Sequence, residues 1–308
     1  MARAEPGSAA LVGGPTAAGS VVGATDILRG AGIPTPRLDA ELLVGHALGR
    51  ERAWLHAHPD AELDATASGL LAGWVERRAS GEPIAYIRGF KEWLSLRIIT
   101  DRRALIPRPE TELLAEAAIS EISARLVRDD APVQAWEVGT GSGALALALA
   151  LRFRASISLG RLHLAASDDS AEALELAAEN LAGQRVGGLV TLACGDLLEP
   201  AVGAGNGIDL LIANLPYLTS ADAAASGGSL DWEPRAALDG GPDGLDLLRR
   251  LIVALPRRLS HDGVALLEVG AGQADAVRAL VAALDMRTAV TTLRDLAAIE
   301  RVVRIARV

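Results

Sequence analysis

The fold is decided by the stretch Ile208-Asp209-Leu210-Leu211-Ile212-Ala213-Asn214-Leu215-Pro216-Tyr217. A short run rich in Ile and Leu that stops at Asn and Pro predicts a buried strand ending in a tight turn. In an open α/β sheet, ligands bind at the carboxyl ends of the strands. Asn214 offers a carbonyl acceptor there, and Leu215, which precedes a proline, is expected to be extended with its own carbonyl pointing outward. Two adjacent acceptors suit a planar NH2 group.

Strand and helix patterns alternate around this stretch. After the break at Asp129-Asp130-Ala131-Pro132, further apolar runs predict strands over 133–138, 162–166 and 190–193. Helical patterns separate them, and Pro and Glu residues over 106–112 predict the start of a preceding helix that runs to about residue 126. This alternation predicts a mostly parallel sheet with helices on both faces.

The first predicted strand leads into a glycine-rich loop, Glu137-Val138-Gly139-Thr140-Gly141-Ser142-Gly143, and a helix is expected from about Ala144. Glycines let the backbone turn sharply and approach a ligand, and the free N–H groups of the following helix favour anionic groups. The spacing G-x-G-x-G differs from that of dinucleotide-binding loops and of P-loops. The loop predicts a small-molecule site without identifying the cofactor.

Carboxylates follow the second and third predicted strands. Asp168 is placed to accept both ribose hydroxyls of an adenosine, while Asp169 is a candidate helix cap. Asp196 can accept from an adenine amino group, and Leu197 can pack against the base. Taken singly, each aspartate is better explained as a helix cap or a turn residue. Together with the loop and the Asn214 turn they predict S-adenosylmethionine rather than NAD, with Asn214 facing the methyl group.

The N-terminal third predicts three segments. Residues 1–20, rich in Ala, Gly, Pro and Ser, predict a disordered extension, and residues 21–80 show helical periodicity. Gly81-Glu82-Pro83 breaks this pattern, and residues 81–106 predict a β-hairpin linker with strands at 84–87 and 94–99 and a turn near Gly89. Residues 107–308 then form the α/β domain.

The linker region carries a local excess of positive charge. Its basic residues are Arg88, Lys91, Arg97, Arg102, Arg103 and Arg108, against the acidic Glu92 and Asp101. Two interpretations stay open, a solvated face and a docking surface for an anionic partner.

Composition excludes several classes of protein. The net charge of −9 and pI near 5.1 argue against a dedicated non-specific nucleic-acid binder. Cys194 is the only cysteine, so neither an intramolecular disulfide nor a cysteine-based metal site can form, and no metal is predicted. The longest apolar run, 143–151, falls short of the ~20 residues of a membrane-spanning helix. A cytoplasmic protein without a secretory signal is expected.

The motifs together resemble the PrmC/HemK family of peptide chain release factor glutamine-N5 methyltransferases. The matching segments are the helical 36–43, the linker 81–89, the IPRPETE signature at 106–112, the GTGSG loop at 139–143, the block EPRAALDGGPDG at 233–244, and LLEVG at 266–270. The resemblance covers residues 21–308.

This resemblance implies a class I S-adenosylmethionine-dependent methyltransferase domain, Rossmann-like, at 107–308. It implies a monomer that methylates the glutamine side-chain amide in the GGQ motif of class 1 release factors, without stable nucleic acid or membrane binding. The implied catalytic residues are Asn214, Leu215, Pro216 and Tyr217. The implied cofactor-binding residues are Glu137, Gly139, Thr140, Gly141, Ser142, Gly143, Asp168, Asp196, Leu197 and Asn214.

Two departures from the family pattern stand out. Leu215 replaces the first proline of the usual Asn-Pro-Pro-Tyr turn, and extra residues fall at about 154–160, before the second strand. Leu215 keeps the backbone carbonyl and gives up only the fixed φ of proline, so activity is expected to be retained.

Three rival functions remain open. A DNA or RNA amino-group methyltransferase shares the same kind of turn, but the acidic charge and the absence of an obvious target-recognition domain disfavour it. Leu215 motivates a catalytically silent release-factor binder. An NAD oxidoreductase is disfavoured by the glycine spacing.

Overall fold

The chain divides into two compact units in the computed structural model, which describes residues 16–128, 131–203, 207–225 and 227–308. The first unit contains Met1–Gly89 together with Gly227–Trp232, and the second contains Phe90–Ser226 and Glu233–Val308. The division falls at Gly89, so the predicted linker of residues 81–106 is split between the two units.

The first unit is helical, as its periodicity predicts. Its helices are α1 (Ala17–Gly30), α2 (Pro36–Ala47), α3 (Arg52–Ala57), α4 (Ala65–Ala79) and α5 (Ile84–Arg88). Leu28, Leu43 and Leu71 are among the side chains that form its buried core.

The predicted disordered extension is wrong over residues 17–20. Helix α1 begins at Ala17, because the Thr16 side chain caps it by accepting a hydrogen bond from Gly19 N. The rest of that prediction, residues 1–15, lies outside the described residues.

The segment Gly227–Trp232 belongs to the helical unit through a buried arginine. Arg78 is almost fully buried and pairs with Asp39 at 2.7 Å. It also donates to Ser229 Oγ at 3.0 Å, and Ser229 in turn donates to the Gly81 carbonyl. A chain segment that lies far away in the sequence thus supplies part of this unit, which the sequence did not indicate.

The predicted strand at 84–87 is wrong. These residues form the one-turn helix α5, which follows Pro83 and ends at Gly89 with a φ of +74°. A short apolar run does not distinguish a strand from a helix. The hairpin lies later, with β1 (Phe90–Trp93) antiparallel to β2 (Leu96–Ile99). Its turn residues Leu94 and Ser95 both have positive φ without being glycine, so the usual Asn-Gly turn signal is missing.

The second unit is built on a seven-stranded sheet. Its strands are β3 (Val133–Val138), β4 (Leu162–Asp168), β5 (Val190–Cys194), β6 (Ile208–Ala213), β7 (Leu259–Glu268), β8 (Thr288–Arg294) and β9 (Glu300–Arg307). The spatial order is β5-β4-β3-β6-β7-β9-β8; β3 to β7 run parallel, and β9 is antiparallel to both β7 and β8. The predicted α/β architecture is confirmed. The strand order reverses between β3 and β6, the place where such sheets bind ligands.

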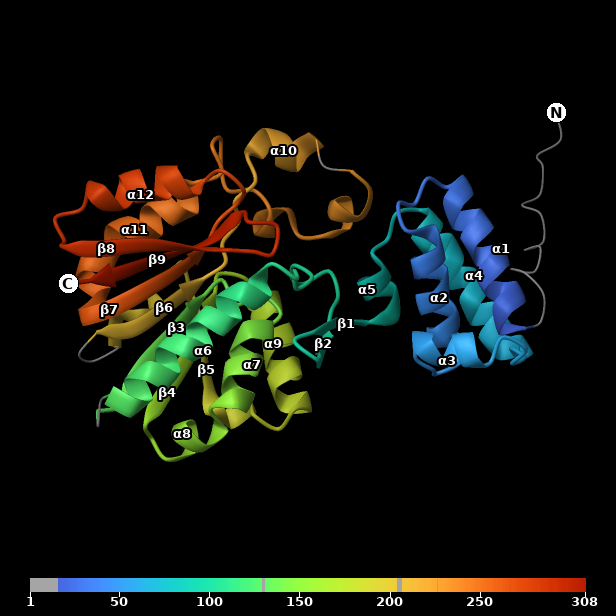
Figure 1. Ribbon diagram of the computed structural model, residues 1–308, viewed down its shortest axis with the longest axis horizontal. Helices are drawn as coiled ribbons and strands as arrows, with labels where there is room; N and C mark the ends of the chain where they lie inside the picture. The colour runs from blue at the N-terminus through green and yellow to red at the C-terminus, as the bar shows by residue number, and fades with distance from the viewer. Residues whose placement is uncertain (1–15, 129–130, 204–206, 226) are drawn as a thin grey trace. The chain divides into compact units, whose positions relative to one another are not determined.

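Helices cover both faces of this sheet (Figure 1). One face carries α6 (Thr111–Arg128), α7 (Ala144–Arg152) and α9 (Ala171–Gly183), and the other carries α11 (Asp246–Arg258) and α12 (Ala274–Ala282). Strand β6 is apolar except at Asp209, because both of its faces are covered. Leu210 and Ile212 join the core under α6, whereas Leu211 and Ala213 join the core under α11.

Shorter elements connect these layers. The remaining helices are α8 (Arg154–Ser158) and α10 (Ser220–Ala225), and the 3₁₀ turns are Gly187–Leu189, Pro200–Gly203, Gly228–Trp232 and Arg235–Ala237. Helix α8 occupies the predicted insertion before the second strand, away from the carboxyl edge of the sheet.

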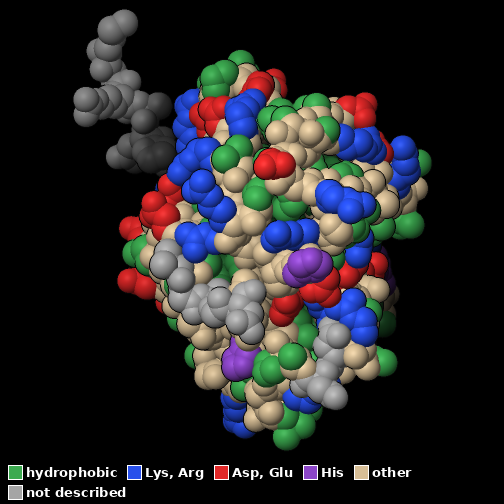
Figure 2. All heavy atoms as spheres, turned by 90° about the vertical axis from the view of Figure 1, so that its left-hand side faces the viewer, with side chains coloured by type: hydrophobic (Ala, Val, Ile, Leu, Met, Phe, Trp, Pro, Cys, Tyr) green, Lys and Arg blue, Asp and Glu red, His purple; other side chains and the backbone are tan. Residues whose placement is uncertain are grey.

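The surface mixes the two signs of charge. On the face shown in Figure 2, Lys and Arg side chains lie beside Asp and Glu side chains. Ion pairs in the second unit are of this kind, for example Arg278 with Glu300 and Arg304 with Glu121. Among the described residues, no helix has both the length and the apolar character needed to cross a membrane.

Candidate active site

A pocket of about 250 Å³ lies at the carboxyl edge of the sheet, where β3 and β6 are neighbours. It brings together most of the residues predicted from the sequence. The predicted residues in its lining are Glu137, Gly139, Thr140, Gly141, Ser142, Asp168, Asp196, Leu197, Asn214, Leu215 and Pro216. Gly143 and Tyr217 lie outside the lining.

The glycine-rich loop depends on left-handed backbone. Gly139 and Gly143 both have a φ of +73°, and Gly141 has a φ of +54°. The loop is tied to the end of β4, because Gly139 N and Thr140 N donate to the Ser167 carbonyl at 2.8 and 3.0 Å. Gly143 does not line the pocket; instead, a Cβ at this position would lie 2.8 Å from the Ala177 Cβ. Gly143 therefore allows α7 to pack closely on α9.

Asp168 braces this loop. One carboxylate oxygen accepts from Gly141 N at 2.8 Å and the other from Ser170 N at 3.0 Å. Burial raises the pKa of Asp168, and these two N–H donors act in the opposite direction. The helix that follows is capped by the Ser170 side chain rather than by Asp169.

The end of β5 is less enclosed. The Asp196 carboxylate is partly exposed and pairs with Arg250 of α11. Leu197 has a φ of +46°, an uncommon conformation for a non-glycine residue, and lines the pocket beside Asp196.

Glu137 is a buried carboxylate at the end of β3. Burial raises its pKa to about 8. Two atoms here, Glu137 Oε2 and Thr140 Oγ1, are buried without a hydrogen-bond partner in the described part of the chain. The Thr140 hydroxyl favours the charged carboxylate, but it does not reach hydrogen-bond geometry with it. Orphaned acceptors facing a pocket fit a cationic or N–H-bearing ligand group.

The turn after β6 lies beside the glycine-rich loop, because β6 and β3 are parallel neighbours in the sheet. The Asn214 side-chain NH2 donates to Thr111 Oγ1 at 3.0 Å. Leu215 is only 4% exposed, and its Cδ2 lies 3.0 Å from where a Cβ on Gly139 would be. Leu215 therefore packs its side chain against the glycine loop. Tyr217 is half-buried, and its carbonyl accepts from Gln273 Nε2 at 3.0 Å.

The glycines of the 233–244 block fit closely around this turn. A Cβ on Gly240 would lie 2.5 Å from the Pro216 carbonyl oxygen, and one on Gly244 would lie 2.3 Å from that of Tyr217. Gly240 N also donates to the Leu218 carbonyl at 2.8 Å. The 233–244 block therefore packs against the backbone of residues 216–218 and fixes its path.

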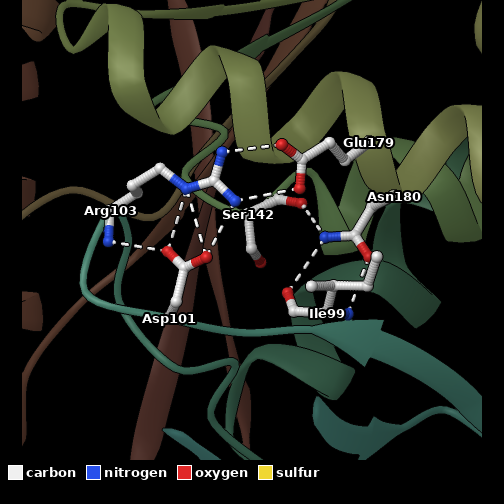
Figure 3. Close-up of polar contacts among 6 residues, drawn as sticks. All are labelled: Ile99, Asp101, Arg103, Ser142, Glu179 and Asn180. Carbon is white, nitrogen blue, oxygen red and sulfur yellow. Dashed lines mark hydrogen bonds and ion pairs between the residues drawn. The ribbon is translucent and has the colours of Figure 1, made fainter. Parts of the chain in front are cut away.

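The segment after the hairpin forms part of the site, which the sequence did not predict. Ala104 and Leu105 line the pocket. Figure 3 shows how the segment is held: Asn180 lies between Ile99 and Ser142 and hydrogen-bonds the backbone of both. The segment thereby reaches the glycine loop through α9.

The same close-up accounts for part of the predicted basic concentration. Arg103 lies between Asp101 and Glu179, at 2.8 Å from each (Figure 3). Arg108 pairs with the buried Glu233 at 2.7 Å. These two arginines hold the segment in place, so their charge is already neutralised within the unit.

Two further residues at the site carried no predicted role. Thr111 lines the pocket beside Asn214, and Glu268 is buried at the end of β7. Both lie inside family-like segments, 106–112 and 266–270. No pattern in the sequence indicates that the two segments meet.

Comparison with known proteins supports the resemblance. Residues 21–89 match the PrmC N-terminal domain family. The Release factor glutamine methyltransferase of Bordetella pertussis is 38% identical over 279 residues, which cover 90% of this chain and 96% of that protein. The protein of the same name from Deinococcus radiodurans is 36% identical over 92% of this chain and 96% of its own length.

Solved structures agree on the fold. The hMettl16 catalytic domain, in complex with MAT2A 3'UTR hairpin 6, matches 76% of this chain and 81% of its own with a TM-score of 0.52 at 11% identity. At that identity the likeness concerns the fold alone. The sequence identity over nearly the whole length of the curated relatives decides the family. The chain belongs to the release factor glutamine methyltransferase family.

Proposed function

We propose that the protein transfers a methyl group from S-adenosylmethionine to the side-chain amide nitrogen (N5) of the glutamine in the GGQ motif of class 1 peptide chain release factors. The observation that carries this proposal is the turn at Asn214, which lines the same pocket as the glycine loop in a chain of this family.

The pocket residues fit the cofactor. The orphaned Glu137 carboxylate and Thr140 hydroxyl suit the ammonium group of its methionine part. Asp168 has lone pairs left for ribose hydroxyls, and Asp196 with Leu197 flanks the place for adenine. When bound, S-adenosylmethionine supplies an electrophilic methyl group on a sulfonium.

The turn at Asn214 orients the substrate amide, which accepts the methyl group. An amide nitrogen is a weak nucleophile, because its lone pair is delocalised into the carbonyl. Asn214 Oδ1 and the Leu215 carbonyl accept the two N–H groups of the substrate amide, which orients the nitrogen and favours the charge that develops in the transition state. No strong base is needed if the proton leaves after methyl transfer. That Tyr217 packs against the substrate amide stays a prediction.

The partner follows from the same proposal. A GGQ loop of a release factor would insert its glutamine into the pocket, with no stable nucleic-acid partner. We expect a monomer that acts in the cytoplasm.

Labelled S-adenosylmethionine, offered with either a release factor or duplex DNA, tests the proposal. We expect label on one release-factor glutamine, located by peptide mapping. Label in DNA alone would reject the proposal in favour of a nucleic-acid methyltransferase. Bound cofactor without label on either substrate would favour a catalytically silent binder.

The variant Asn214→Ala tests whether the turn after β6 takes part in methyl transfer. Turnover should fall by about a hundredfold or more, as for loss of a transition-state acceptor, with cofactor affinity largely unchanged by calorimetry. Gln184→Ala, at the exposed end of α9, is the matched control and should behave as wild type. Wild-type turnover in Asn214→Ala would remove this turn from the mechanism.

A further inference from the structure

Asn214, Thr111 and Glu268 meet at the carboxyl edge of the sheet. Strands β6 and β7 are parallel neighbours, with Ala213 opposite Leu267. The next residue on each strand is Asn214 and Glu268, so these two lie side by side as the strands end. Thr111 begins α6, which packs over the same strands. Glu268 is 1% exposed and Thr111 is 8% exposed.

The polar contacts among them have a defined direction. The Asn214 NH2 donates to Thr111 Oγ1 at 3.0 Å. The Thr111 hydroxyl is near enough to Glu268 to lower its pKa, and the buried Glu268 Oε2 has no hydrogen-bond partner in the described part of the chain. A hydroxyl carries one proton, and an ionised carboxylate can only accept. The Thr111 oxygen accepts from Asn214, so the Thr111 proton is available to the unsatisfied carboxylate oxygen of Glu268. With the proton directed to Glu268, only the NH2 side of the Asn214 amide can be bound by Thr111.

We propose that Glu268 and Thr111 are positioning residues, which hold the Asn214 amide with Nδ2 inward and present Oδ1 to the substrate NH2. The inference rests on the proposed function of Asn214. The two atoms of a side-chain amide exchange places by a half-turn of the group. Without this pair, Asn214 could present its NH2 to the substrate NH2, and two donors would then face each other.

The ionised state of Glu268 determines whether Thr111 donates to Glu268 or to Asn214. Burial raises its pKa to about 7; the Thr111 hydroxyl and Arg301 of β9 lower it, and Glu110 raises it. Tyr217, from the turn, also interacts with this carboxylate: burial raises the pKa of the Tyr217 phenol, and the charge of Glu268 raises it further. A protonated Glu268 becomes a donor to Thr111, which can then donate to Asn214 Oδ1 and reverse the amide. Turnover should therefore rise with pH through about 7.

Enzyme kinetics on matched variants test the pair. In Thr111→Val and Glu268→Gln, kcat should fall by about tenfold to a hundredfold, as expected for a mispositioned group, with cofactor affinity unchanged. Thr111→Ser keeps the hydroxyl and should restore kcat. Glu268→Gln should also lose the rise of kcat with pH. The double variant should be no slower than the slower single variant, because the two residues act as one unit.

The control is Glu121→Gln, on the same helix α6 but paired with Arg304 away from the pocket. It should keep both the wild-type kcat and the pH profile. Wild-type kcat and an unchanged pH profile in both Thr111→Val and Glu268→Gln would overturn the inference.

An activity-independent measurement separates this inference from the proposed function. The chain has three asparagines, 180, 206 and 214, so ¹⁵N-asparagine labelling gives three side-chain NH2 groups, and Asn214→Ser assigns one of them. In the wild type, the Asn214 NH2 resonances should titrate with a midpoint near the pKa of Glu268, about 7. In Glu268→Gln they should not titrate. If the wild-type Asn214 NH2 resonances do not change with pH around 7, then Glu268 and Thr111 do not position Asn214. This conclusion holds whether or not any release factor is methylated.

Discussion

Arg108 and Glu233 join two segments that are 125 residues apart in the sequence, with Arg108 Nη2 2.7 Å from Glu233 Oε1. The other oxygen of the same carboxylate accepts from Ile106 N at 2.9 Å. One buried glutamate thus fixes the 106–112 segment, which carries Thr111, to the 233–244 block that packs around the turn after β6. This relationship gives a structural reason for two of the segments that resemble the family.

Glu233→Ala should destabilise the second unit by about 2–3 kcal/mol, because it leaves a buried N–H and a guanidinium without their acceptor. Urea unfolding followed by circular dichroism measures the change. Glu116→Ala, at an exposed position of α6, should stay within about 0.5 kcal/mol of the wild type. Equal stability of both variants would contradict a fixing role for Glu233.

Leu215 tests whether a backbone carbonyl suffices at this position. Leu215→Pro restores the usual turn and should leave kcat within about fivefold of the wild type, which corresponds to ~1 kcal/mol in the barrier. Leu215→Ala removes the packing against Gly139 and should cost about 2–4 kcal/mol of stability. Kinetics and urea unfolding of both variants provide the measurements. A large gain in kcat for Leu215→Pro would show that the natural residue limits catalysis.

The raised pKa of Glu137 gives the cofactor-free protein a pH-dependent stability. The carboxyl has a pKa near 4.5 in the unfolded chain and about 8 in the fold. Between these values the folded state binds a proton that the unfolded chain has lost, so the free energy of unfolding decreases as pH rises. The contribution is complete below 4.5 and is lost as pH rises through 8.

Glu137→Gln should remove this contribution. Its stability relative to the wild type should therefore increase steadily from pH 4.5 to pH 8, as measured by urea unfolding at several pH values without cofactor. Because other titrating groups affect both proteins alike, only the difference between the two curves is informative. Parallel curves would mean that Glu137 is charged in the cofactor-free fold.

Gly143→Ala should disturb the loop without touching the pocket lining. The positive φ costs about 1–2 kcal/mol for a residue with a Cβ, and overpacking against Ala177 adds about 1–3 kcal/mol. Differential scanning calorimetry should show a lower Tm. Gly183→Ala, on α9 with no atom within 4 Å of the new Cβ, is the control and should be neutral or up to ~1 kcal/mol more stable. A Tm like that of the control would place Gly143 outside the packing of α7 on α9.

The sheet strands were the most predictable elements. The predictions at 133–138 and 208–213 match β3 and β6 residue for residue, because strands covered on both faces carry mostly apolar residues, here interrupted only by Gln134, Glu137 and Asp209. The hairpin was predicted too early in the chain. The run from Ile84 to Ile87 is too short to show whether its period is that of a helix or a strand, and the turn at Leu94 and Ser95 has no glycine. The start of α1 was missed because alanine, glycine and serine resemble a linker until a capping residue such as Thr16 is placed.

The sequence by itself determined the order of the elements, the glycine loop, the carboxylates at successive strand ends and the Asn214 turn. These depend on local backbone preferences and on apolar periodicity, which a single stretch of chain contains. Only the tertiary structure decided which distant groups meet: Glu233 with Arg108, Asn180 with Ser142, and Thr111 between Asn214 and Glu268. Such contacts are set by the register of parallel strands and by the helices packed over them, and no local pattern records them.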